Sequence, residues 1–210
     1  MQTVLLGTEG NQPFKINNKG VSRRHAEITI SDDGSRWTLQ DMKSANGTFV
    51  RREEDGTLVR VGKIDITPMT FICLGPDTAH GCSFYARQVL SQNYGKFDDE
   101  YMYLTRMNEL FNEKLAKVDK KVKILKIIGL LVNVVLILAS FFLPQQNSLW
   151  LLRGGTIITT SMTMLYDGAA NKRKIEKERE RFFHCPNPCC NHKLRPADIE
   201  NYQCPRCKKP

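Results

Sequence analysis

Two pairs of cysteines near the end of the chain have the spacing of a metal-binding site. The second pair is Cys204-Pro-Arg-Cys207, and the first pairs Cys185 with either Cys189 or Cys190. Thiolates in this pattern surround Zn²⁺ tetrahedrally at about 2.3 Å. We prefer Cys190 for the first pair, because Cys189 then occupies the tip of a longer turn. The expected ligands are Cys185, Cys190, Cys204 and Cys207.

The segment around these cysteines, residues 184–210, resembles a zinc ribbon. His184 and His192 are the alternative ligands. So short a unit can scarcely build a hydrophobic core, and Zn²⁺ would therefore supply most of its folding free energy. Four cysteines leave no open coordination position, which argues for a structural metal ion and against a catalytic one.

Two almost entirely apolar runs lie upstream of the cysteines. Residues 127–143 contain no charged residue, and residues 149–166 contain only Arg153. A bilayer is crossed by roughly 17–25 apolar residues. The connection begins with Pro144, which cannot continue a helix. We therefore expect a two-helix transmembrane hairpin over residues 127–166. A buried hairpin in a soluble bundle is disfavoured, because no other segment could bury both helices.

Basic residues on both sides of the hairpin predict its orientation. Residues 114–126 and residues 172–181 each contain six lysines or arginines. By the positive-inside rule, both termini of this multi-pass membrane protein are cytoplasmic, which places it in the plasma membrane, or in the inner membrane if the chain is bacterial. The lipid bilayer is then one partner. Because the cytoplasm is reducing, a disulfide framework is disfavoured for the C-terminal cysteines. Cys73 and Cys82 fall on candidate strands, and we expect them to be packed thiols.

Two helical segments flank the hairpin. Residues 91–126 are expected to form a linker and a juxtamembrane helix, because apolar residues repeat every seven positions from Leu104 to Leu125. Residues 167–183 predict a charged helical stalk, with opposite charges one turn apart. The interleaved glutamates cancel much of the positive field of the stalk, so nucleic acid is disfavoured as a partner.

Residues 1–90 have the pattern of short β-strands separated by turns. Apolar and polar residues alternate, and Asn-Gly, Asp-Gly and Gly-Pro pairs separate the runs. The expected strands are Ala26–Ile30, Trp37–Leu39, Thr48–Arg52, Leu58–Val61, Thr70–Leu74 and Ser83–Arg87. Such spacing indicates an all-β sandwich. The expected fold is therefore multidomain, with a β-sandwich, a transmembrane hairpin and a small zinc ribbon.

Two motifs in residues 1–90 resemble those of the forkhead-associated (FHA) family. The run Val21-Ser-Arg-Arg-His-Ala26 contains S-x-x-H, and Ser44-Ala-Asn-Gly-Thr-Phe-Val50 contains N-G-T, with Asp41 between them. The resemblance covers residues 4–87. It implies an antiparallel sandwich in which loops at one end bind a phosphothreonine peptide.

The resemblance also implies roles for single residues. Ser22 and Arg23 would contact the phosphate, and Asn46 would hold the ligand backbone. His25 would brace its loop from inside. The residues that would shape the second loop are Gly47 and Thr48.

One position departs from the family pattern. The family has Gly-Arg upstream of S-x-x-H, with the arginine gripping the phosphate, whereas this chain has Gly7-Thr8. A hydroxyl does not reproduce the fork of a guanidinium. We therefore place Thr8 in the expected binding surface together with Lys15, and expect Lys15, Lys19 or Arg23 to compensate. A phosphate dianion needs convergent donors, and hydroxyl, guanidinium and turn N–H groups provide them.

Composition and motifs exclude other classes of function. The chain has 210 residues and a net charge of +9, and it contains no Walker A, G-x-S-x-G or H-E-x-x-H motif. We therefore expect a non-enzymatic, membrane-anchored adaptor that binds a threonine-phosphorylated protein or a Ser/Thr kinase substrate. The alternative is an assembly subunit of a membrane complex that uses the same fold without phosphate. A membrane-tethered nucleic-acid binder is a third, less favoured class.

Overall fold

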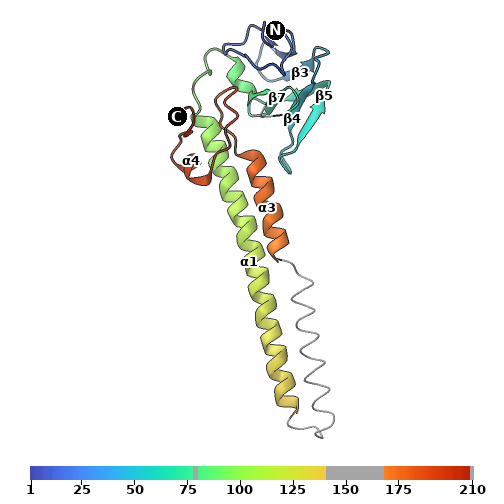
Figure 1. The fold of residues 1–210 in the computed structure, drawn as a ribbon, viewed down its shortest axis with the longest axis vertical. Coiled ribbons are helices and arrows are strands. Elements are labelled where there is room, and N and C mark those ends of the chain that lie inside the picture. Colours follow the sequence, from blue (N-terminus) through green and yellow to red (C-terminus); the bar gives the residue numbers. More distant parts are fainter. Residues whose placement is uncertain (78–79, 141–167, 209–210) are drawn as a thin grey trace. The chain divides into compact units, whose positions relative to one another are not determined.

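The computed structural model describes residues 1–77, 80–140 and 168–208 (Figure 1). Within these ranges, eight strands are followed by one 3₁₀ helix and three α-helices. The strands are β1 (Gln2–Leu6), β2 (Ala26–Ile30), β3 (Trp37–Asp41), β4 (Thr48–Arg51), β5 (Leu58–Val61), β6 (Lys63–Ile66), β7 (Phe71–Leu74) and β8 (Cys82–Tyr85). The helices are η1 (Ala86–Val89), α1 (Asp98–Ser140), α3 (Gly168–Phe182) and α4 (Pro196–Glu200).

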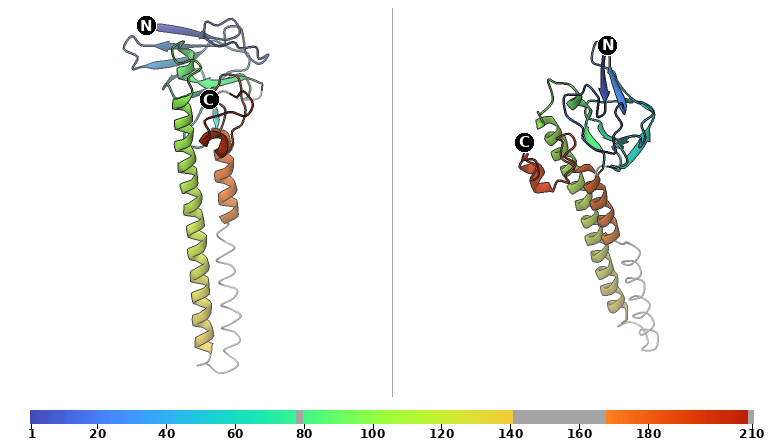
Figure 2. Two further views of the ribbon diagram at one scale, coloured as in Figure 1. Left: turned by 90° about the vertical axis from the view of Figure 1, so that its left-hand side faces the viewer. Right: turned by 45° about the horizontal axis from the view of Figure 1, so that its top comes forward.

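The strands form two antiparallel sheets that pack as a β-sandwich (Figures 1 and 2). One sheet has the order β1-β2-β3-β6, and the other has the order β5-β4-β7-β8. Side chains alternate across a strand, so Ala26, Ile28 and Ile30 of β2 are buried while the residues between them are half-buried. The apolar inner faces of the two sheets form the core. The predicted β-sandwich is confirmed.

Six strands lie where the sequence predicts them. Strands β2 and β5 have the predicted bounds, and the ends of β3, β4, β7 and β8 differ from prediction by one or two residues. The sequence pattern does not predict β1 and β6, the two edge strands of one sheet. Three of the four residues of β6 are exposed. Because β6 has no buried face of its own, its pairing with β3 defines it rather than its own pattern.

Helix α1 is one continuous helix from Asp98 to Ser140 (Figure 2). It runs from the predicted juxtamembrane helix into the first apolar run without a break. Within the described residues, α1 is the one helix that is long and apolar enough to cross a membrane. Its most apolar stretch of 18 residues has a mean hydropathy of 2.4, and none of that stretch is buried. The second apolar run, residues 149–166, lies outside the described residues, so the hairpin stays a prediction.

The chain forms two compact units. Met1–Asn108 and Glu178–Pro210 make up the first, and Glu109–Lys177 make up the second. In the second unit, Lys172 of α3 pairs with Asp119 of α1 at 2.5 Å. In the first, the C-terminal cysteine segment belongs to the same compact unit as the sandwich. The C-terminal residues that are buried there include Phe182, Phe183, Leu194 and Ile199.

A buried arginine joins the sandwich to the end of α3. Arg51 of β4 is 7% exposed. Its guanidinium donates to the carbonyl of Phe182 at 2.7 Å and to the hydroxyl of Tyr85 at 2.9 Å. It also lies 4.1 Å from the ring centroid of Phe71. Because Phe182 is the last residue of α3, the cation lies where the final helix carbonyls carry partial negative charge.

Candidate functional site

Two loops meet at one end of the first sheet. Ala26 pairs with both Leu6 and Asp41 across β1, β2 and β3. The loop that enters β2, residues 7–25, and the loop that leaves β3, residues 42–47, therefore lie next to each other. They carry the S-x-x-H and N-G-T motifs, and we call them the motif loops.

A buried histidine bridges the motif loops. His25 is fully buried, its Nδ1 accepts the N–H of Ser22 at 3.0 Å, and its Nε2 lies 3.0 Å from the carbonyl oxygen of Gly47. Because Nδ1 accepts, Nε2 carries the hydrogen and donates to Gly47. Burial lowers the pKa of His25 below its ordinary value of 6.5, against opposing effects of the Gly47 hydrogen bond and the charge of Asp41. The imidazole is therefore neutral at pH 7.

A second set of hydrogen bonds shapes the loop that leaves β3. One carboxylate oxygen of Asp41 accepts the hydroxyls of Ser44 at 2.6 Å and of Thr48 at 2.7 Å. The Ser44 hydroxyl in turn accepts the N–H of Gly47 at 3.0 Å. Burial opposes ionisation of Asp41, but these hydrogen bonds prevail and lower its pKa. Thr48 is fully buried, so its side chain supports the loop from inside.

Ser22 and Asn46 each link one motif loop to the other. The hydroxyl oxygen of Ser22 accepts the N–H of Ala45 at 3.1 Å. The amide of Asn46 donates to the carbonyl of Gly20 at 2.9 Å. Ser22 is half-buried and Asn46 is exposed, so both side chains also face solvent. The fold thus brings together two polar groups that are 24 residues apart in the sequence.

The charged and polar residues predicted beside Ser22 are exposed. Arg23 lies 3.9 Å from Glu9 in a surface ion pair, and its side chain is 80% exposed. The N–H of Thr8 donates to the carbonyl of Ser22 at 3.3 Å, so the backbone of Thr8 adjoins the S-x-x-H motif. Lys15 is exposed, and its carbonyl oxygen lies 3.9 Å from Sγ of Cys189.

Arg60 of β5 lies against the second motif loop, and sequence reasoning missed it. A Cβ placed on Gly47 would stand 2.5 Å from Nε of Arg60. Gly47 also has a φ of 85°, where a residue without a Cβ is favoured. Arg60 reaches this loop because it pairs with Phe49 across β4 and β5. No pattern local to either segment signals that pairing.

Residues 4–74 match the family described as FHA domain. The chain carries an FHA domain at its N-terminus. FhaB of Mycobacterium tuberculosis and FhaB of Mycolicibacterium smegmatis are each 35% identical to the chain over 60 residues. The aligned segment is 29% of this chain and 37% of FhaB, so the chain spans little more than a third of these curated relatives.

Solved FHA structures are also similar to this domain. One comes from an analysis of phosphothreonine-dependent FHA domain interactions; it is 30% identical and covers 35% of this chain and 69% of that chain, with a TM-score of 0.29. Another is the FhaA FHA domain complexed with the intracellular domain of Rv3910, which is 30% identical over 35% of this chain and 72% of that chain, with a TM-score of 0.28.

The four cysteines expected to bind metal form a cluster beside the FHA domain. Their sulfur atoms all lie within 4.8 Å of one another. The sulfurs of Cys185 and Cys207 are 3.7 Å apart, and those of Cys190 and Cys204 are 4.0 Å apart. Four sulfurs at about 2.3 Å from a tetrahedral Zn²⁺ are about 3.8 Å from one another. The cluster therefore fits a metal ion such as Zn²⁺.

The backbone around the cluster suits thiolate ligands. The N–H groups of Asn187 and His192 donate to the sulfurs of Cys185 and Cys190, and the second knuckle supplies two similar donors to Cys204. The hydrogen bond from Cys185 and, to a smaller extent, the N–H of His192 lower the pKa of Cys190 to about 5, although burial opposes this. His184 and His192 lie outside the cluster.

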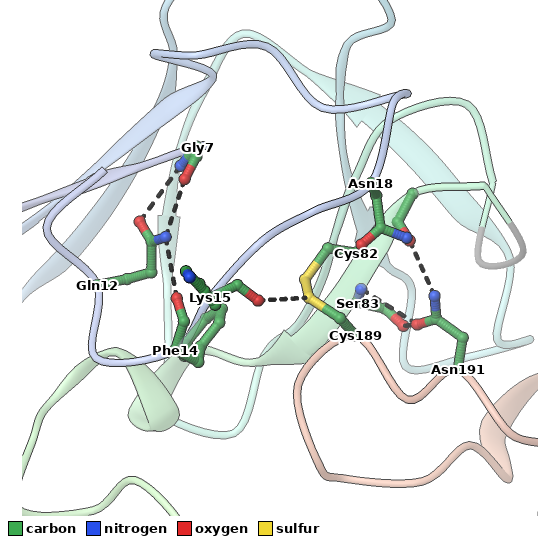
Figure 3. The surroundings of a disulfide bond; sticks show 10 residues. Gly7, Gln12, Phe14, Lys15, Asn18, Cys82, Ser83, Cys189 and Asn191 are labelled. Carbon is green, nitrogen blue, oxygen red and sulfur yellow. Dashed lines mark hydrogen bonds between the residues drawn. A yellow bond between two sulfur atoms is a disulfide. The ribbon is translucent and has the colours of Figure 1, made fainter. Parts of the chain in front are cut away.

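Cys189 has a different partner from the other C-terminal cysteines. It forms a disulfide with Cys82 of β8, and the two Cα atoms are 4.3 Å apart (Figure 3). The expectation that Cys82 is a packed thiol and the preference against disulfides in the C-terminal segment were wrong. The first rested on the strand position of Cys82 and the second on the redox compartment, whereas the fold brings together two residues that are 107 positions apart. Cys73 is a buried free thiol as predicted, and burial raises its pKa to about 12.

The buried His25 predicts a pH-dependent stability of the FHA domain. Its folded-state pKa lies below 6.5, so its stabilising effect is complete above pH 6.5 and is lost as the pH falls through the folded-state pKa. We expect the melting temperature of the peptide-free chain to fall between pH 7 and pH 5, and His25→Gln to reduce that fall. His184, whose burial lowers its pKa to about 4, contributes equally in both proteins. Identical slopes would contradict the assignment.

The cluster predicts which cysteine substitutions remove the metal. The full chain should bind one Zn²⁺, measured by inductively coupled plasma mass spectrometry. Cys204→Ser should lose the metal because three thiolates remain. Cys189→Ser should keep it, because the Cys189 sulfur is bonded to Cys82 and not part of the cluster. Zinc lost from Cys189→Ser, or retained at full occupancy by Cys204→Ser, would reject this ligand set.

Proposed function

We propose that this protein is a membrane-anchored adaptor that binds threonine-phosphorylated proteins through its FHA domain. The observation that carries the proposal is the pair of motif loops, in which Ser22 and Asn46 lie on a frame held by the buried His25. Binding and catalytic side chains are commonly displayed on loops of a rigid sandwich. The partner would be a substrate of a Ser/Thr kinase.

The phosphate would be held first by Ser22 and Arg23. Since the Ser22 oxygen accepts the Ala45 N–H, its own hydrogen can still be donated to a phosphate oxygen. The exposed Arg23 is 3.9 Å from Glu9, and a surface ion pair of this kind contributes little. Arg23 can therefore turn from Glu9 to a phosphate dianion at small cost. Asn46 would hold the backbone of the bound peptide.

Positive charge on the motif loops supports an anionic ligand. The loops contain five basic residues and one acidic residue, Glu9, which gives a net charge of +4. All five basic side chains are exposed: Lys15, Lys19, Arg23, Arg24 and Lys43. A surface of one sign raises the local concentration of an oppositely charged ligand. We assign Lys15 to the binding surface on this ground, and Thr8 because its backbone adjoins Ser22.

The presence of threonine at position 8, where the FHA family has arginine, favours a second function. A threonine hydroxyl lacks the two parallel donors with which arginine holds phosphate. The alternative is that the FHA domain docks on a subunit of a membrane complex without phosphate, as a structural or assembly component. Binding experiments on the intact chain separate the two functions.

We also propose how the remaining parts serve this function. Helix α1 and the second apolar run would anchor the protein as a two-span membrane hairpin with both termini in the cytoplasm. The four-cysteine cluster would hold a structural Zn²⁺, because all four ligand positions are occupied by cysteines. The chain would thus act by binding, without a catalytic step of its own.

The phosphate contacts can be tested on the full chain in lipid nanodiscs. The probe is a peptide library with a fixed central phosphothreonine, compared by calorimetry with the unphosphorylated library. Ser22→Ala and Arg23→Ala should each weaken binding about 10- to 100-fold, because each removes a hydrogen bond to a charged group. Thr8→Arg should tighten binding. Arg36→Ala, at the opposite end of β3 and paired with Asp65, is the matched control and should have no effect.

Two results would favour the assembly subunit instead. The first is equal binding of the phosphorylated and unphosphorylated libraries by the natural chain. The second is phosphate-dependent binding that is created only by Thr8→Arg.

The hairpin orientation can be tested by labelling engineered cysteines in intact cells. A cysteine at Gln146, in the predicted connection between the spans, should react with a membrane-impermeant thiol reagent. A cysteine at Ser91 should be protected, because it would be cytoplasmic. Both signals are measured above the labelling of the natural chain. Equal labelling at the two positions would exclude the proposed topology.

A further inference from the structure

Two asparagines from distant parts of the chain donate to one carbonyl oxygen in the FHA domain. Asn18 Nδ2 lies 2.9 Å from the carbonyl oxygen of Gly81, and Asn191 Nδ2 lies 2.8 Å from the same atom (Figure 3). Asn18 belongs to the first motif loop, and Asn191 directly follows the cluster cysteine Cys190. Gly81 is buried just before β8. This carbonyl therefore connects the cysteine segment with a motif loop.

Asn191 is held in place from two sides. Its Oδ1 accepts the N–H of Ser83 at 3.2 Å and also the Ser83 hydroxyl. Its φ of 52° is left-handed, a conformation that asparagine tolerates better than most residues. Two residues earlier, the N–H of Cys189 donates to the carbonyl of Ser83 at 3.1 Å, beside the disulfide to Cys82 (Figure 3). The amide of Asn191 thus points to Gly81 from a fixed backbone.

The hydrogen bond between Asn18 and Gly81 also affects the proposed binding surface, through a turn that follows Asn18. The carbonyl of Asn18 accepts the N–H of Val21 at 3.0 Å, which closes a turn directly before Ser22. Within that turn, the carbonyl of Gly20 accepts the amide of Asn46. The turn at residues 18–21 is therefore held by Gly81 on one side and by Asn46 on the other. Its position decides where Ser22 presents its hydroxyl.

We propose that Asn191 is a positioning residue for the phosphopeptide-binding surface, acting through Gly81 and Asn18. The proposal rests on the proposed phosphothreonine binding, and it makes residues 189–191 part of the FHA binding module although they follow it by about a hundred residues in sequence. Without the Asn191 amide, Gly81 keeps one of its two donors and the turn at residues 18–21 is held less firmly.

The local structure allows this role to be separated from docking of the cysteine segment. The disulfide and the Cys189 N–H hold that segment on β8 when the Asn191 side chain is changed. Asn191→Gly removes both side-chain contacts and tolerates the positive φ. Asn191→Asp also tolerates it and keeps an acceptor for Ser83, but it loses the donor to Gly81. Ser83→Ala removes one contact to Asn191 and leaves the Gly81 contact.

The first measurement is amide hydrogen exchange of residues 18–22 in the full, disulfide-bonded chain without peptide. In the Asn191→Gly and Asn191→Asp variants, the backbone amides of residues 18–22 should exchange faster than in the natural chain, because the hydrogen-bonded turn opens more often. Ser83→Ala should lower the melting temperature without changing this exchange. Asn201→Gly, an exposed position after α4, is the matched control and should change neither. Unchanged exchange in both Asn191 variants would overturn the proposal.

The second measurement is the affinity for the phosphothreonine library. Asn191→Asp should weaken binding about 3- to 10-fold, as expected for one hydrogen bond, and Ser83→Ala should not. The double variant with Asn191→Asp and Asn18→Ala should weaken binding no further than the stronger of the two single variants, because both side chains act through the Gly81 carbonyl. Full additivity would contradict the relay. If exchange responds but the natural chain binds no phosphopeptide, the positioning role stands and the proposed function fails.

Discussion

The buried guanidinium of Arg51 is the interaction on which the joining of the two chain ends depends. A cation removed from water is stable only when its donors are satisfied and its charge is balanced. The partners of Arg51 are the carbonyl of Phe182, the hydroxyl of Tyr85 and the faces of aromatic rings. They come from α3, β7 and β8, so Arg51 can be buried only when the sandwich and the C-terminal segment are together. The two ends of the chain therefore form one compact unit.

This arrangement supplies the cysteine segment with a core that it cannot build alone. Its apolar residues, such as Phe183 and Leu194, are buried within the unit that also contains the sandwich. In return, the knuckle at residues 189–191 covers β8, which is an edge strand of its sheet. A covered edge cannot pair with strands of other chains. The disulfide between Cys82 and Cys189 fastens the same contact covalently.

The proposed binding surface combines a hydrogen-bonded interior with solvent-accessible donors. His25 and Asp41 are held by hydrogen bonds within the motif loops, and such satisfied polar networks favour one conformation. The groups that would meet a phosphate, Ser22 and Arg23, are accessible to solvent. Ser22 and Asn46 have both roles, because they link the two motif loops and would also bind the ligand, whereas His25 and Asp41 act only within the loop frame.

The sequence by itself determined the features that depend on local spacing: the alternation of β2, the turn motifs around His25 and Gly47, the apolar run in α1 and the two knuckles, one with Cys185 and Cys190 and the other with Cys204 and Cys207. These follow from strand and helix periods and from short loops, so they need no knowledge of distant contacts. Only the tertiary structure decided the rest. It paired the exposed edge strand β6 with β3, and it placed Arg60 on Gly47. It also joined Cys82 to Cys189 and directed Asn18 and Asn191 to one carbonyl. In each of these contacts, the local sequence pattern of one segment does not indicate its partner. The partners come close only when the sheets pack and the C-terminal segment folds back on β8.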